Sequence, residues 1–162
     1  MIKLTEFVSV ERKPNMSEFV KRKNFLAAGG IMSALISLLH FILALKPEFY
    51  RYITAGRESE LARMAESGST ATSIGTISLG ILFAIWAIYA FSGAGLIRRL
   101  PLIRMVLVII AFIYILRALF LFTEINMVLD EGYPFRFVVF SAISLAAGAL
   151  YLAGILKKGE QS

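Results

Sequence analysis

The chain has 162 residues, of which 58% are hydrophobic and 17% charged, and its 17 Lys and Arg against 11 Asp and Glu give a net charge of +6. With a mean hydropathy of +0.75 and its apolar residues in long blocks, it has too little polar surface for a soluble or a disordered protein. The absence of cysteine excludes disulfides and thiolate metal sites.

The first 24 residues are polar and basic, and they precede the first long apolar block. Asn15 and Glu18 have the spacing of a capping box, which predicts that a helix begins there. The basic run Lys21-Arg22-Lys23 follows. We expect residues 1–24 to form a cytoplasmic amphipathic segment that lies on anionic lipid, with a cytoplasmic protein partner as the alternative.

Four apolar blocks are long enough to cross a membrane, since a hydrocarbon core of roughly 30 Å takes about 20 helical residues. They cover residues 25–45, 74–97, 101–122 and 135–156. Their unbroken apolar character does not match the alternating pattern of barrel strands, so each span is expected to be helical. The sequence therefore predicts an all-α integral membrane protein, a four-helix bundle over residues 25–156 with a short cytoplasmic tail at 157–162.

The segment between the first two spans, residues 46–73, is too long for a simple turn. Pro47 favours a helical turn at its start. A second short amphipathic helix is predicted to begin near Ser59 and to stop at Gly68. Because so short a helix does not persist alone in water, we expect it to rest on the outer leaflet or to cover the outer ends of the spans. Residues 123–134 are expected to form the other outer loop.

Basic residues concentrate on one side of this predicted topology. That side carries Lys3, Arg12, Lys13, Lys21, Arg22, Lys23, Arg98, Arg99, Arg104, Lys157 and Lys158. The other side carries Lys46, Arg51, Arg57, Arg63 and Arg136. The positive-inside rule then places both termini in the cytoplasm. The net charge is thus a topology signal, and no nucleic-acid partner is expected.

Small and polar residues recur on single faces of the spans, which is how membrane helices approach one another closely. In the first span this face holds Gly29, Ser33, Ser37, His40 and Ala44. The last span has two such faces, one with Ser141, Ser144, Gly148 and Tyr151 and the other with Ala142, Ala146, Ala149 and Ala153. Two small faces on one helix predict two helical neighbours. We expect one neighbour to belong to a second copy or to another subunit, so that the protein is a homo-oligomer or part of a membrane complex.

Trp86 and Tyr89 lie about one helical turn apart near the middle of the second span. Such a pair packs across a helix interface, where its N–H and O–H groups find acceptors. A lining for a flat apolar ligand is the functional alternative.

Arg117 is the charged residue that the topology does not explain. A helical side chain leans toward the N-terminus of its helix, which directs Arg117 toward the membrane centre. An unpaired guanidinium there costs about 2.5–3.5 kcal/mol, so a partner within the protein is expected. The candidates are His40, Ser141, Tyr114 and Glu124, the last of which lies roughly 10 Å away along a straight helix. They predict either a buried polar clamp or a site for an anion, a lipid headgroup or a quinone-type ligand, with His40 supplying a proton or hydrogen bond.

No catalytic or metal-binding spacing accompanies these residues. A single histidine, no paired carboxylates within a span and no Gly-rich phosphate loop argue against a catalytic centre, a metal site or a bound cofactor. The leading hypothesis is a non-catalytic membrane subunit, or a module that binds lipid or a small ligand. A small channel or carrier that uses Arg117 and His40 is the first alternative, and a membrane enzyme acting on a lipid or quinone is the second.

The run WAIYAFSGAGLIRRLPL at residues 86–102, the segment ARMAESGS at 62–69 and the later Arg117 resemble small bacterial inner-membrane proteins. The resemblance implies four helices and a location in a bacterial inner membrane. It implies no particular activity and no site residues.

Overall fold

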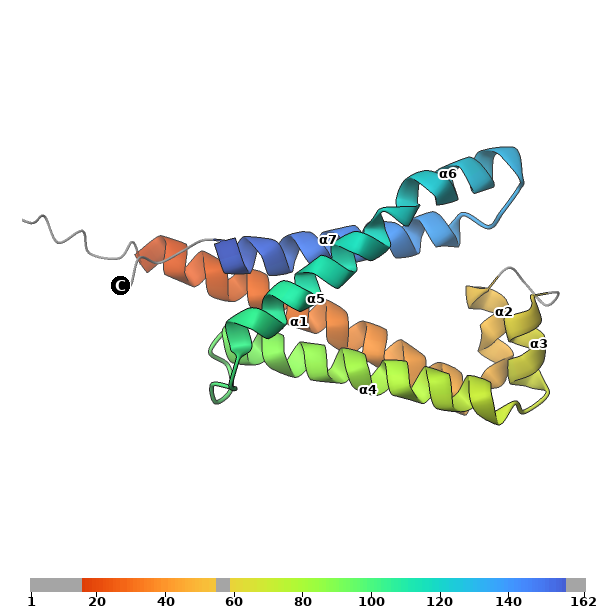
Figure 1. Ribbon diagram of the computed structural model, residues 1–162, viewed down its shortest axis with the longest axis horizontal. Coiled ribbons are helices and arrows are strands. Elements are labelled where there is room, and N and C mark those ends of the chain that lie inside the picture. The colour runs from red at the N-terminus through yellow and green to blue at the C-terminus, as the bar shows by residue number, and fades with distance from the viewer. Residues whose placement is uncertain (1–15, 55–58, 157–162) are drawn as a thin grey trace, which may run out of the picture.

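The computed structural model describes residues 16–54 and 59–156, except for the side chains of Glu18 and Phe19. All regular structure in these two ranges is helical (Figure 1). The predicted all-α class is therefore confirmed. The predictions for residues 1–15, which include the Asn15 cap, and for the tail at 157–162 lie outside the described residues.

Four helical stretches are long and apolar enough to cross a membrane, as predicted. They are α1 (Met16–Leu45), α4 (Thr70–Gly93), α5 (Ile103–Ala118) continued by α6 (Phe120–Asp130), and α7 (Arg136–Leu156). The basic run at 21–23 belongs to α1, so it forms one helix with the first span. In Figure 1 the stretches alternate in direction, and both ends of the described chain lie at the same end of the molecule.

The second helix begins and ends before the predicted span 74–97 does. It ends because Gly95 takes a left-handed φ of 74° and the chain turns away. The Gly95 N–H donates to the Ser92 carbonyl at 3.0 Å, and the Leu96 N–H donates to the Phe91 carbonyl at 2.9 Å, which satisfies carbonyls at the helix end. At its other end α4 begins at residue 70, so the loop predicted for residues 46–73 is shorter than expected.

The third helical stretch extends well beyond the predicted span 101–122. After the turn residue Leu119, α6 continues to Asp130, so the prediction of a loop at 123–134 is wrong over most of its length. The segment is polar at several positions, yet its apolar residues keep helical spacing. The 28 residues of α5 and α6 measure about 42 Å, which is longer than a hydrocarbon core. In a membrane, such a stretch would tilt or extend beyond the apolar layer.

The long helices pack in a limited set of pairs. α1 packs along α4 and against α7, and α7 also packs along α5. Two glycines of α7 allow these close approaches: Gly148 lies against Ile115 of α5, and Gly154 lies against Leu26 of α1. One predicted small face of α7 is buried in these contacts, namely Ser141, Ser144, Gly148 and Tyr151. On the other face, Ala142, Ala146 and Ala149 are exposed.

The described short helices between α1 and α4 lie at the end of the molecule opposite the two ends of the described chain (Figure 1). They are η1 (Pro47–Phe49), α2 (Tyr50–Ile53) and α3 (Glu60–Glu66). As predicted, Pro47 opens the first of them and Ser59 caps α3, where its hydroxyl accepts from the Ala62 N–H at 3.1 Å. Gly68 ends the turn after α3 with a φ of 77°.

These short helices share a small apolar core with α1. It consists of Leu43, Tyr50, Ala62 and Ala65. The Tyr50 hydroxyl also forms a hydrogen bond with the Thr76 hydroxyl on α4. The connection therefore rests on the ends of α1 and α4, which supplies the tertiary support that helices this short require.

Candidate functional site

Hydroxyls from three helices and a carbonyl from a fourth form one hydrogen-bonded chain around Ser33. The Ser33 hydroxyl lies 2.9 Å from the Tyr114 hydroxyl and 2.8 Å from the Tyr151 hydroxyl, and Tyr151 donates to the Trp86 carbonyl at 3.3 Å. Each hydroxyl has one proton, so Tyr151 donates to the carbonyl, Ser33 to Tyr151, and Tyr114 to Ser33. This arrangement satisfies every donor and joins α1, α4, α5 and α7. We call these four groups the Ser33 hub.

Trp86 lies beside the Ser33 hub with only 7% of its surface exposed. Its ring meets Phe83 and Tyr114 edge to face, with centroids 5.1 and 5.2 Å apart. Tyr89 is half-buried against the same core. Trp86 and Tyr89 thus both pack in the apolar core around the Ser33 hub.

The contacts of His40 are with its own helix and with α4, and not with Arg117. Its Nδ1 atom is 2.8 Å from the Ile36 carbonyl on its own helix, and its ring centroid is 5.2 Å from that of Phe83 on α4. Tyr114 is likewise engaged elsewhere, in the Ser33 hub. Two of the four partners considered for Arg117 therefore make their contacts with other groups.

Arg117 contacts the other two candidates, Glu124 and Ser141. Its Nη1 atom lies 3.0 Å from the Glu124 Oε1 atom and donates to the Ser141 hydroxyl at 2.5 Å. Ser141 is fully buried on α7, and the Glu124 side chain is only 13% exposed. The Arg117 guanidinium also lies over the Phe120 ring, 5.9 Å from its centroid. These charge-assisted contacts tie α5, α6 and α7 together.

The direct contact between Arg117 and Glu124 is closer than a straight helix alone would provide. Residues seven apart share a helix face but lie roughly 10 Å apart along the axis. Both side chains are long, and the helix is interrupted between them at Leu119. Together these features close the gap with no third side chain between the two charges.

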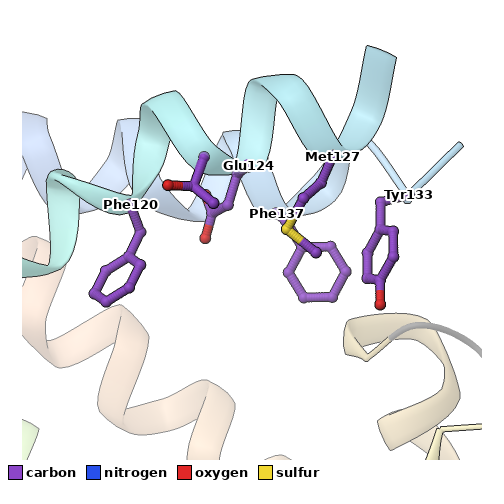
Figure 2. Close-up of a pocket in the computed structure, with 6 residues that line it drawn as sticks. Phe120, Glu124, Met127, Tyr133 and Phe137 are labelled. Carbon is purple, nitrogen blue, oxygen red and sulfur yellow. The ribbon is translucent and has the colours of Figure 1, made fainter. Parts of the chain in front are cut away.

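A cavity of about 210 Å³ lies beside this ion pair. It is bounded by α6, by the turn that follows α6 and by the first turns of α7, and we call it the α6 cavity. Its lining residues are Phe120, Thr123, Glu124, Met127, Tyr133 and Phe137. Figure 2 shows the rings of Phe120, Phe137 and Tyr133 extending toward the same side. Apart from Glu124 and the hydroxyls of Thr123 and Tyr133, the wall consists of aromatic rings and the thioether of Met127.

The carboxyl group of Glu124 is only half used by the protein. Oε1 accepts from Arg117, whereas Oε2 is buried and has no hydrogen-bond partner among the described residues. Buried polar atoms in folded proteins are nearly always paired, and leaving one unpaired is costly. Glu124 thus adds a buried and unpaired carboxylate oxygen to the group of residues that line the α6 cavity.

Sequence reasoning missed the aromatic and thioether wall of this cavity. Phe120, Glu124 and Met127 are spaced by four and three residues, the spacing of one helix face. That signal is present in the sequence, but it is hidden when residues 123–134 are read as a loop. Tyr133 and Phe137 line the cavity because the chain folds back after α6, and the local spacing of residues does not predict this.

Arg136 makes a second unexpected connection near the start of α7. Its Nε and Nη2 atoms donate to the Thr54 carbonyl at 3.0 and 2.5 Å. Thr54 follows α2 directly, so Arg136 holds the short connecting helices against α7. On α2 itself, Arg51 pairs with Glu66 of α3 at 3.2 Å.

Within residues 16–54 and 59–156, no group of three or more His, Asp or Glu side chains lies close enough to hold a metal ion. The chain matches no protein-family model, and no curated protein or solved structure matches it.

The Arg117–Glu124 pair predicts a measurable energetic coupling. Arg117→Met and Glu124→Gln, made singly and together, should give a coupling free energy of about 0.5–3 kcal/mol in reversible unfolding from mixed micelles, because each single change leaves a partly buried charge unpaired. The matched control is the pair Arg51→Met and Glu66→Gln, whose more exposed carboxylate should couple by no more than about 1 kcal/mol. Equal coupling in the two cycles would contradict the account of Arg117.

Proposed function

We propose that the protein is a non-catalytic, multi-pass protein of a bacterial inner membrane that binds a small amphiphilic molecule in the α6 cavity. The observation that carries this proposal is the cavity itself, with an unpaired carboxylate oxygen in a largely aromatic wall. Ligand sites typically combine an apolar lining with a few placed polar groups, and this cavity has that composition.

The size of the α6 cavity supports a ligand that is only partly enclosed. Its volume of about 210 Å³ is below the range of roughly 300–1,000 Å³ that holds a complete drug-sized molecule. A headgroup or a ring fits inside, while an apolar tail extends beside α6 into lipid. This favours a molecule that partitions into the membrane over a water-soluble metabolite.

The pairing of the polar groups favours binding over transport. A carrier that used Arg117 and His40 would bring the two to one site, but Arg117 pairs with Glu124 and His40 with its own helix. An enzyme acting on a lipid or quinone would require reactive groups at the α6 cavity, where Glu124 is the single charged residue among the described residues of the lining.

The orientation proposed here places both termini in the cytoplasm, in keeping with the excess of basic residues at that end of the helices. The α6 cavity then faces the outer half of the membrane. Self-association through the exposed Ala142, Ala146 and Ala149 face of α7 belongs to the same proposal, because small residues in lipid stabilise helices by close packing. Anionic lipid is the proposed contact of the basic N-terminal segment.

The orientation is testable by cysteine labelling, for which a chain with no native cysteine is well suited. In intact cells or right-side-out vesicles, a membrane-impermeant maleimide should label Glu60→Cys on α3. It should label Arg99→Cys, in the turn after α4, only once the membrane is permeabilised. Both positions are exposed, so accessibility does not bias the comparison. The reverse pattern would refute the proposed orientation.

Binding in the α6 cavity is testable by native mass spectrometry of protein extracted from membranes. The wild-type chain should retain a bound amphiphile, and Phe137→Trp, which fills part of the cavity, should lose it. Phe112→Trp is the matched control, because Phe112 is 63% exposed on α5 and should leave retention unchanged. Equal retention in both variants would refute the site. The same spectra report the oligomeric state, and monomers alone would refute self-association.

A further inference from the structure

We infer that the α6 cavity selects a neutral ring that carries a hydroxyl, such as a hydroquinone or another phenol, over the corresponding carbonyl form. This inference rests on the proposed ligand site and adds to it the chemical class of the ligand. Three features of the cavity carry it: the free acceptor on Glu124, the charge balance with Arg117 and the aromatic wall.

The free acceptor decides which polar group the ligand must present. Oε2 of Glu124 is buried and has no donor among the residues that the structure describes, and an ionised carboxylate oxygen can only accept. A hydroxyl satisfies it by donating a hydrogen bond. A quinone or ketone carbonyl has no proton to donate, so it would place two acceptor oxygens together and leave Oε2 unpaired.

The balance of charge between Arg117 and Glu124 favours a neutral ligand. The Arg117 guanidinium, 3.0 Å from Oε1, already compensates the Glu124 carboxylate. A bound cation would add an uncompensated positive charge to a site with a mostly apolar wall, and a bound anion would face Oε2 directly. Both cost desolvation free energy that a neutral donor avoids.

The aromatic wall of the α6 cavity favours a ring as the enclosed part of the ligand. Phe120, Tyr133 and Phe137 present three aromatic side chains, and Met127 adds a polarisable thioether. Aromatic rings pack edge to face or offset against such a wall, and thioethers make favourable contacts with ring edges. In Figure 2 the three rings lie on the side of α6 that Glu124 shares, so a ring between them can reach the carboxyl group.

The inference predicts a reversal of preference in Glu124→Gln. Arg117 supplies only donors, so it will hold the amide oxygen of the new side chain and turn the amide NH₂ toward the α6 cavity. The cavity then offers a donor in place of an acceptor. The variant should prefer a carbonyl ligand, whereas Glu131→Gln, at an exposed position just after α6, should behave as wild type.

The experiment measures saturable binding of decylhydroquinone and decylbenzoquinone to the protein in lipid nanodiscs, without oxygen, above the uptake by empty nanodiscs. The wild type should bind the hydroquinone about tenfold more tightly than the quinone. The hydroquinone pairs with the buried Oε2 acceptor of Glu124, whereas the quinone leaves it unpaired. Glu124→Gln should reverse that order, and Phe137→Ala should weaken both ligands.

Each other outcome overturns a definite part of the account. Equal binding of the two forms by the wild type, or an unchanged preference in Glu124→Gln, refutes donor selection. If Phe137→Ala still weakens the binding of both ligands in that case, the α6 cavity remains the proposed site, but it does not select a hydrogen-bond donor. If a folded wild-type protein binds neither form saturably, the ligand is not a ring of this class. If the protein then still retains a different amphiphile in the α6 cavity, the proposed function holds and only this inference is refuted. Should Glu124→Gln fail to fold, the ratio measured on the wild type alone decides.

Discussion

The hydroxyl of Ser33 is the point on which the arrangement of the long helices depends. It bonds the hydroxyls of Tyr114 and Tyr151, and the latter reaches the Trp86 carbonyl, so one side chain from each of three helices and the backbone of a fourth meet in one hydrogen-bonded chain. All of these groups belong to buried residues, and each would be costly if it were left unpaired. The need to satisfy all of them together restricts how α1, α4, α5 and α7 can cross.

From this crossing the helices extend to two differently built regions. Along α1 and α4, the short connecting helices close the end of the molecule through the core around Tyr50 and Leu43. Along α6 and α7, no residue of α6 is buried, and the contacts include the Arg117–Glu124 pair with Ser141. The α6 cavity lies beside that pair. Glu124 belongs to both features, because its Oε1 atom pairs with Arg117 and its side chain lines the α6 cavity.

Much of the fold follows from the sequence, and the reasons for the remainder are physical. Composition and block length predict the apolar helices, and Pro47, Ser59 and Gly68 predict the short helix boundaries, because each of these signals is local. The cost of an unpaired guanidinium in apolar surroundings predicts that Arg117 has a partner within the protein, but it does not select Glu124 and Ser141 from the four candidates. The extension of α6 to Asp130 was not predicted, because polar residues among apolar ones fit a loop and an amphipathic helix alike. The choice of Ser33, and not Arg117, as the partner of Tyr114 depends on side-chain directions at a helix crossing, which residue spacing does not fix.

The most direct test of this account is the distance between Arg117 and Glu124 in a lipid bilayer. Solid-state NMR of protein with ¹⁵N in the Arg117 guanidinium and ¹³C in the Glu124 carboxyl group would measure their dipolar coupling. The account predicts the strong coupling of a directly hydrogen-bonded pair, in keeping with 3.0 Å between Nη1 and Oε1. Absence of that coupling, with the Arg117 guanidinium in contact with water or lipid phosphate instead, would contradict the clamp and the cavity chemistry that depends on it.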